Sequence, residues 1–146
     1  MANQKPCYIM DKNQSIRIGI EEGIFKWSGN NQLELESHPG VMINYKKNYT
    51  FASKNSNILV NKFWANPRED ILNEDWILVL NDTASTVLHY FFIPKGKLSV
   101  TNFKTRSLNN KNKLIINIPC NNTNFPNNGI DFYKFKEKLS VAYKLK

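Results

Sequence analysis

The sequence is poor in the side chains that most often bind metals or act as nucleophiles. Its 146 residues include two cysteines, Cys7 and Cys120, and two histidines, His38 and His89. The cysteines form no CxxC pair, and neither histidine has another histidine or cysteine within ligand spacing. This pattern gives no support for a zinc site or a disulfide framework. The sequence therefore predicts no metal ion and no cofactor.

Glycine-rich phosphate loops and long apolar segments are also missing. The six glycines form neither GxxxxGKS/T nor GxGxxG, and no GxSxG nucleophile motif occurs. No window reaches the roughly 18 apolar residues of a membrane span. The first residues, MANQKPCYIMDKNQ, lack the apolar run of a signal peptide. We therefore expect one cytoplasmic domain, residues 1–146, that makes no contact with a membrane.

Negative charge is scarce in the last third of the chain. Residues 1–94 contain nine Lys/Arg and ten Asp/Glu, whereas residues 95–146 contain eleven Lys/Arg and two Asp/Glu. The formal net charge of +8 therefore comes entirely from the last third, which carries +9 against −1 for the rest. Clustered positive charge attracts polyanions over about 8–10 Å. A lysine-rich, solubilising surface in a protein of AT-rich coding origin is the alternative explanation.

The most apolar stretch is DWILVLNDTASTVLHYFFIPKGKL, residues 75–98. Its two runs, 76–80 and 87–93, are nearly continuous in apolar residues, which is typical of strands buried on both faces. We predict that they form a central strand pair, and that Pro94 ends the second strand because proline cannot donate to a β-ladder. His89 lies inside this second strand and is expected to be a neutral core residue.

Alternating apolar and polar residues predict that most of the remaining chain is also strand. FKWSGNNQLEL, residues 25–35, has the pattern of a hairpin, and further strands are expected at 41–53, 57–64, 97–103 and 113–119. A short helix near 67–74 is expected to begin at Pro67, with Asn66 as its cap. A C-terminal helix is expected to begin at Asp131. Residues 140–146 continue that helix or form a last strand.

Residues 15–28 allow two interpretations. Ile16, Ile18 and Ile20 alternate as in a strand, whereas Ile16, Ile20, Ile24 and Trp27 have helical spacing, with Ser15 as a possible N-cap. We favour strands, because Gly19 and Gly23 would each cost a helix about 1 kcal/mol relative to alanine. The predicted fold is α+β, with a mostly antiparallel sheet, a short helix and a C-terminal helix.

Two lysine-rich segments are candidates for contact with nucleic acid. NYKKNYTF, residues 44–51, interleaves lysine with aromatic residues, and PKGKLSVTNFKTRSLNNKNK, residues 94–113, has cations around Phe103 and in a following asparagine-rich loop. Lysine and arginine neutralise phosphates, and aromatic rings stack on bases. No RNP1, GXXG or helix-turn-helix motif is present. The candidate binding residues are Lys46, Lys47, Lys62, Lys95, Lys97, Lys104, Arg106, Lys111 and Lys113.

A nuclease would need two or three carboxylates at adjacent strand ends to hold magnesium. The restriction-endonuclease-like pattern places an acid on one strand and Glu-x-Lys on the next. Lys62 fits that lysine, but position 60 is valine and residues 37–67 contain no Asp or Glu. The remaining weak catalytic candidates are Glu74, Asp75 and His89. An enzyme of this kind would have a variant or degenerate site.

The sequence favours binding of a polyanion, DNA or RNA in the first instance, through a surface in the last third of the chain. Limited sequence readout is expected, because lysine–phosphate contacts carry no base information. Two alternatives stay open. One is the nuclease-like enzyme. The other is an interaction or inhibitor module whose lysine face meets an acidic protein partner.

Overall fold

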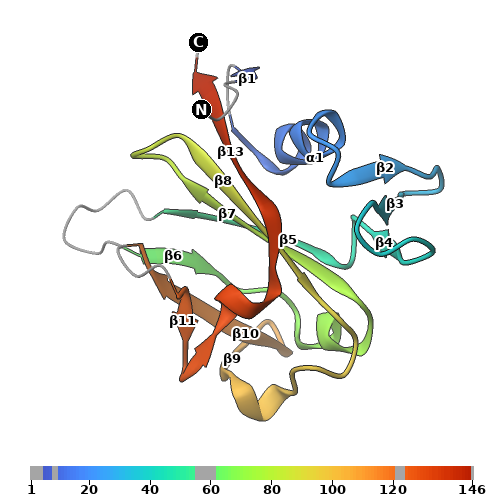
Figure 1. Cartoon of the computed structure of the whole chain (residues 1–146). Coiled ribbons are helices and arrows are strands. Elements are labelled where there is room, and N and C mark those ends of the chain that lie inside the picture. Colours follow the sequence, from blue (N-terminus) through green and yellow to red (C-terminus); the bar gives the residue numbers. More distant parts are fainter. Residues whose placement is uncertain (1–4, 8–9, 55–61, 121–123, 146) are drawn as a thin grey trace.

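The computed structural model describes residues 5–7, 10–54, 62–120 and 124–145 (Figure 1). Its one α-helix in these ranges is α1 (Lys12–Glu21), and three short 3-10 helices are η1 (Glu69–Asn73), η2 (Val100–Asn102) and η3 (Phe132–Phe135). The strands are β1 (Lys5–Cys7), β2 (Phe25–Trp27), β3 (Gln32–Leu35), β4 (Met42–Asn44), β5 (Tyr49–Lys54), β6 (Lys62–Ala65), β7 (Trp76–Asp82), β8 (Val87–Ile93), β9 (Lys104–Leu108), β10 (Lys111–Pro119), β11 (Pro126–Asn127), β12 (Ile130–Asp131) and β13 (Lys136–Leu145).

A large sheet in the order β1-β13-β8-β7-β5-β6-β10-β9 forms the body of the molecule (Figure 1). Its β1–β13 and β5–β7 pairs are parallel, and its other neighbouring pairs are antiparallel. A smaller antiparallel sheet, β2-β3-β4, lies beside α1, and β11 and β12 form a two-stranded ribbon. The fold is α+β with a mostly antiparallel sheet, as the sequence predicts.

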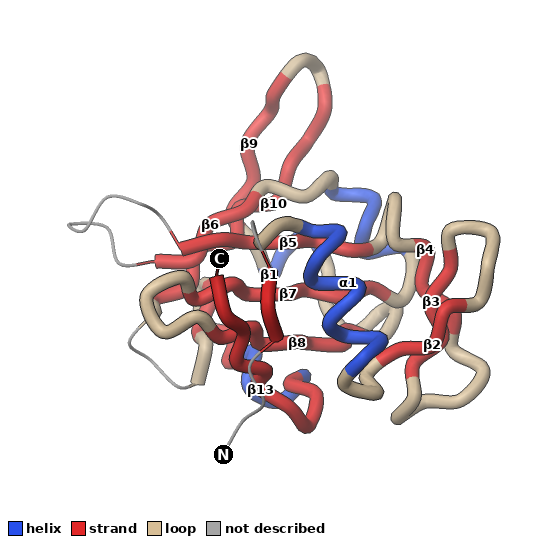
Figure 2. The backbone as a smooth tube through the Cα atoms, turned by 90° about the horizontal axis from the view of Figure 1, so that it is seen from above, coloured by secondary structure: helices blue, strands red, loops and turns tan. Residues whose placement is uncertain are grey.

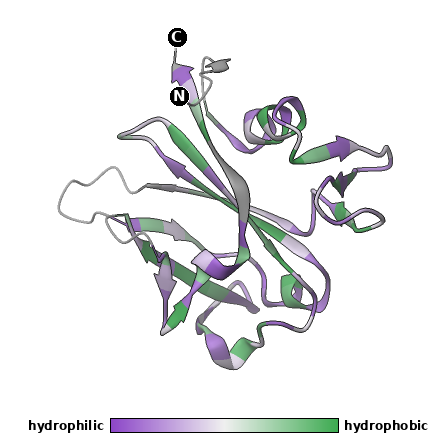
Figure 3. Cartoon of the chain, viewed as in Figure 1, coloured by the Kyte–Doolittle hydropathy of each residue, from purple (hydrophilic) through white to green (hydrophobic). Residues whose placement is uncertain are grey.

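The central pair β7–β8 separates two hydrophobic cores. Ile77 and Val79 belong to the first core, which α1 and the small sheet cover, whereas Leu78 and Leu80 belong to the second. The second core also contains apolar residues of β6, β10, η1 and η3. Residues 76–81 of β7 are all buried, so the predicted burial on both faces is confirmed. Figure 3 shows α1 carrying both hydrophobic and hydrophilic residues, as a helix on one face of a core should.

Residues 12–21 form a helix, so the favoured interpretation of this segment as strands was wrong. Asp11 is the N-cap, and its side chain accepts a hydrogen bond from the Gln14 amide at 2.9 Å. Gly19 allows the helix to approach β2 closely, since a Cβ there would lie 2.4 Å from Cε2 of Phe25. Gly23, with φ of +76°, lies in the turn after the helix. Both glycines argue against a helix by propensity, but Gly19 allows the close packing of the helix and Gly23 allows the left-handed turn that follows it.

Tyrosine hydroxyls fix α1 onto the large sheet. The Ser15 hydroxyl lies 2.7 Å from the Tyr49 hydroxyl, and the Tyr90 hydroxyl donates to the Ser15 carbonyl at 2.6 Å. Burial raises the pKa of both tyrosines, so they stay neutral at physiological pH. Phe25 contacts both rings edge-on, with centroid distances of 6.1 and 5.7 Å. These contacts join the helix, the small sheet and the central strands.

The C-terminal segment departs from its predicted helix. Residues 132–135 form the 3-10 helix η3, and residues 136–145 form strand β13, which agrees with the alternative of a last strand. Phe132 is buried, Phe135 packs against the same core, and the strand that follows pairs with β8. Among the described residues, no helix is long and apolar enough to cross a membrane.

Two further expectations need adjustment. Residues 97–103 contain a turn and η2 in place of a strand, and Phe103 enters the second core. β6 accounts for 62–64 of the strand expected at 57–64, and the rest of that segment lies outside the described residues. The hairpin at 25–35 is confirmed as β2–β3.

Replacement of Gly19 with alanine tests the packing of α1. Helix propensity alone would make this change stabilising by about 1 kcal/mol. The contact with Phe25 predicts the opposite sign, a loss of about 1–3 kcal/mol in the free energy of unfolding, because an added methyl group overpacks the core. Urea denaturation of G19A measures the change. In a double-mutant cycle, F25L should recover part of the loss; stabilisation by G19A alone would contradict this packing.

Candidate nucleic-acid interface

The β9–β10 hairpin carries four cations on one face. Asn109 and Asn110 form its turn with φ of +52° and +62°, the left-handed values of a type I′ turn. Arg106 pairs with Lys113, and directly paired residues of antiparallel strands point to the same side. Every second residue of a strand points to the same side, so Lys104 and Lys111 lie on the same side as this pair. We call this side the hairpin face, and its cations are Lys104, Arg106, Lys111 and Lys113. Figure 2 shows the hairpin projecting from the body of the molecule.

These cations have no carboxylate partner in the described part of the chain. Lys104, Arg106 and Lys111 are exposed, and Lys113 is half-buried. Ion pairs in the described part of the chain join Lys26 to Glu36 and Arg68 to Asp70, and neither includes a cation of the hairpin face. Like charges directly opposite each other destabilise a strand pair, so Arg106 and Lys113 repel each other. A bound anion would relieve that repulsion.

Arg68 extends the row of cations beyond β10. It forms an isolated β-bridge with Lys113, and the Leu114 amide donates to the Pro67 carbonyl at 2.8 Å. The side-chain amide of Asn66 donates to the Leu114 carbonyl at 2.9 Å, so Asn66 anchors this segment to β10. The prediction that Asn66 caps the short helix was wrong, because the residue before η1 is Arg68 and no side chain caps it.

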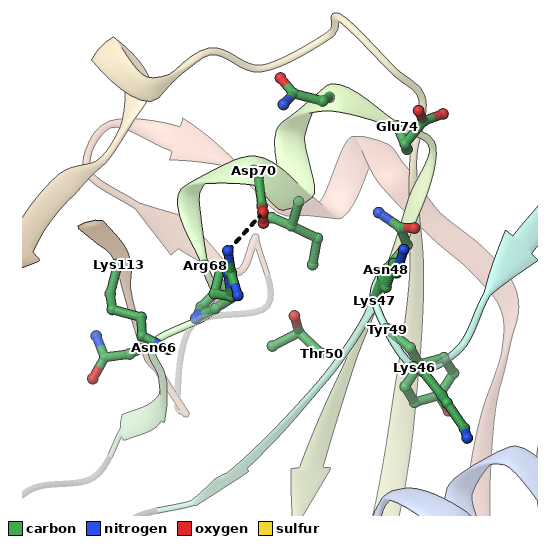
Figure 4. Close-up of a pocket in the computed structure, with 13 residues that line it drawn as sticks. Lys46, Lys47, Asn48, Tyr49, Thr50, Asn66, Arg68, Asp70, Glu74 and Lys113 are labelled. Atoms are coloured by element: carbon green, nitrogen blue, oxygen red, sulfur yellow. Dashed lines mark ion pairs between the residues drawn. The ribbon is translucent and has the colours of Figure 1, made fainter. Parts of the chain in front are cut away.

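A cavity of about 680 Å³, here called the η1 pocket, lies between β10, η1 and the turn from β4 to β5 (Figure 4). In Figure 4, Arg68 and Lys113 lie on one side of it, Lys47 and Asn48 on the other, and Thr50 between them. Its ionisable lining residues other than Tyr49 are Lys46, Lys47, Arg68, Asp70, Glu74 and Lys113. The pocket has two carboxylates, Asp70 and Glu74. Asp70 forms an ion pair with Arg68 at 3.2 Å, so this carboxylate is already neutralised by a cation.

Lys46 and Lys47 reach the η1 pocket from a tight turn. The Asn44 side-chain oxygen accepts hydrogen bonds from the backbone amides of Lys46 at 2.9 Å and Lys47 at 3.2 Å, which holds the backbone of both lysines in the turn. The strand expected over 41–53 is therefore interrupted at 45–48. Tyr49 is buried and bonded to Ser15, so its ring belongs to the core and is closed to a ligand.

The other predicted cations lie elsewhere in the fold. Lys62 pairs with Pro119 at one end of β10, whereas Lys113 is near the other end, six residues away and roughly 20 Å along the strand. Lys95 and Lys97 are exposed in the turn after β8. The Lys95 amide donates to an Asp75 carboxylate oxygen at 2.7 Å. Six of the nine predicted residues thus lie on the hairpin face or line the η1 pocket.

The weak catalytic candidates are not brought together. Glu74 lines the η1 pocket and Asp75 precedes β7, whereas His89 pairs with Leu80, roughly 16 Å further along β7. The His89 ring packs against Phe125 at a centroid distance of 5.1 Å. Burial, aided by Lys136 and opposed by Asp82, lowers the pKa of His89 to about 4. A general base works best with a pKa near the operating pH, so this environment suits a neutral structural imidazole.

No group of three or more His, Cys, Asp or Glu side chains within the described residues is placed to hold a metal ion. The restriction-endonuclease-like arrangement would require such a group at adjacent strand ends. β5 and β7 are parallel neighbours, but within residues 37–67 the sequence has no acid to supply from β5. The described geometry therefore offers cations to a ligand and no cluster of acids.

Arg68 is the binding candidate that the sequence did not reveal. It stands alone in ANPRED, a segment expected to form a helix, between two segments richer in lysine. Its place beside Lys113 depends on the pairing of residues 66–68 with β10, which no local pattern encodes.

No protein-family model matches this chain, and searches of curated proteins and of solved structures found nothing similar to it. The fold defines its class, an α+β protein with a mixed eight-stranded sheet. Function must accordingly be argued from the side chains themselves.

Acid titration tests the environment of His89. Its pKa is about 4 in the folded protein and 6.5 for an ordinary histidine, so the folded state disfavours protonation. The free energy of unfolding should be unaffected by His89 above about pH 6.5 and should fall by at most about 3 kcal/mol between pH 6.5 and pH 4. Urea denaturation across this range, compared with H89Q, measures the effect. An identical pH dependence in both proteins would contradict the assignment.

Proposed function

We propose that this protein binds a polyanion, DNA or RNA in the first instance, on the hairpin face and at the η1 pocket. The main observation behind this proposal is the β9–β10 register. It places four cations on one side of a projecting hairpin, namely Lys104, Arg106, Lys111 and Lys113. Four cations without a carboxylate between them match a backbone of repeated phosphates.

The η1 pocket supports the same function because it continues the row of cations. Arg68 lies beside Lys113 on one side of the pocket, and Lys47 lies on the other side (Figure 4). Arginine can bind a phosphate with two parallel hydrogen bonds, whereas lysine acts as a point charge. A phosphate in the pocket would compete with Asp70 for Arg68. Glu74 would limit how far the chain of phosphates continues toward β7.

The contacts proposed for this surface are to phosphates, so affinity should depend more on charge than on sequence. Successive cations on one strand of the hairpin are two residues apart, about 7 Å along the strand. An acidic protein is the alternative partner for the same charges. Pull-down from nuclease-treated lysate separates the two partners, since association through nucleic acid would disappear.

Removal of two charges from the hairpin face tests the proposed function. R106Q/K113Q should reduce affinity for DNA or RNA roughly 10- to 100-fold at 0.1 M salt. It should also reduce the steepness of the log K against log salt plot by about two, one for each lost phosphate contact. Fluorescence anisotropy with a labelled oligonucleotide over 50–200 mM salt measures both quantities.

K134Q/K144Q is the matched control, because it changes the net charge equally on η3 and β13. Figure 2 places β13 away from the hairpin. The control should retain nearly the affinity and salt slope of the unaltered protein. Equal losses in the two double variants would show that net charge alone attracts nucleic acid, and no detectable binding by the unaltered protein would refute the proposal.

A further inference from the structure

A second groove, of about 360 Å³, lies between α1 and the small sheet. We call it the Trp27 groove. It is lined by Asn13, Ile16, Arg17, Ile20, Glu21, Trp27 and Tyr45. The lining therefore combines aromatic and aliphatic side chains with a few polar ones, which is the usual composition of a small-molecule site.

Trp27 is exposed to 56%, although the chain buries most of its large aromatic residues. Its ring packs against Tyr45 at a centroid distance of 5.5 Å and an interplanar angle of 38°. Tyr45 is itself held twice to Asn31, through its hydroxyl to the side-chain oxygen and through its amide to the carbonyl, each at 3.0 Å. The two rings thus form a supported aromatic surface with one ring open to solvent.

Chain continuity joins this aromatic surface to the η1 pocket. Tyr45 lines the Trp27 groove, and the next residues along the chain, Lys46 and Lys47, line the η1 pocket. Consecutive Cα atoms are about 3.8 Å apart, so the backbone that lines the groove at Tyr45 passes directly to the first lysine of the η1 pocket. Figure 4 shows the Lys46 side chain extending away from Arg68, on the side of the pocket where α1 lies.

We infer that the Trp27 groove receives an unpaired nucleobase of a strand whose phosphates contact Lys46 and Lys47. This inference rests on the proposed function and adds a substrate class, single-stranded nucleic acid. Tyr45 contacts the Trp27 ring and covers part of it. A base would stack on the part of the Trp27 ring that remains exposed to solvent. Arg17 lines the groove and supplies a planar cation that can stack on a base or contact a phosphate.

The groove should distinguish single-stranded from double-stranded nucleic acid, because only an unpaired base can enter it. In a duplex the bases are stacked inside the helix, and their faces are closed to a tryptophan. A single strand can turn one base into the groove while its phosphates remain at the lysines, without the unstacking penalty of a duplex. The protein should therefore bind single strands more tightly than duplexes of equal length at equal salt.

Tryptophan fluorescence tests the inference in a W64F background, where Trp27 is the exposed tryptophan and Trp76 is buried. A single-stranded oligonucleotide should quench the Trp27 emission on binding, and a strand of abasic sites with the same phosphates should bind without quenching. Binding of the base-bearing strand with no change in Trp27 emission would overturn the inference.

Substitution of Trp27 supplies the second measurement. W27L should reduce affinity for the single strand about 5- to 150-fold, the range for one stacked base, and leave duplex affinity unchanged. Y133L is the matched control, because Tyr133 is exposed to 57% on η3, outside both the Trp27 groove and the η1 pocket. Thermal unfolding confirms that each variant is folded, and W27F, which keeps a smaller ring, should retain part of the affinity.

The two proposals fail in different ways. If R106Q/K113Q weakens binding while W27L and the abasic strand bind as well as their counterparts, the polyanion surface stands and the base site is refuted. If neither the single strand nor the duplex binds, both are refuted.

Discussion

The burial of β7 and β8 on both faces is the constraint on which the rest of the structure depends. Alternate residues of β7 enter opposite cores, so neither face of this strand is available to solvent or to a ligand. Such a strand pair stabilises the fold and restricts function to the periphery. His89 illustrates the point, because its ring lies against Phe125 and its pKa is lowered mainly by burial. The side chains at the centre of the sheet are packed and uncharged, so we expect binding at the edges of the sheet instead.

The segments that carry the cations are all connected to the β7–β8 pair through neighbouring strands of the large sheet. β5 pairs with β7 and begins after the turn that holds Lys46 and Lys47. β6 pairs with both β5 and β10, and β10 extends beyond it to form the hairpin. The segment before η1 pairs with β10 at Lys113. Three segments that are distant in sequence therefore carry their cations on strands of the same sheet or directly next to them.

The sequence predicted the structure correctly where the local residue pattern determines whether a segment is buried. The predictions were wrong or incomplete where a contact between distant residues determines the structure. The apolar runs of β7 and β8 were sufficient to predict a central pair, because no other environment accommodates them. Gly19 misled the interpretation of α1, since its close contact with Phe25 is invisible to helix propensity. The lysines of residues 104–113 could be recognised as a group, but their common face follows from the hairpin register. Arg68 joins them only through a bridge to β10.

Mapping of backbone amide chemical shifts during titration with a short oligonucleotide at low salt tests the central claim most directly. A polyanion bound at the hairpin face and the η1 pocket should most strongly perturb the amides of residues 45–47, Asn66, Arg68 and residues 104–113, with little effect on β13. Perturbations confined to β13 and η3, or none at saturating oligonucleotide, would contradict the account.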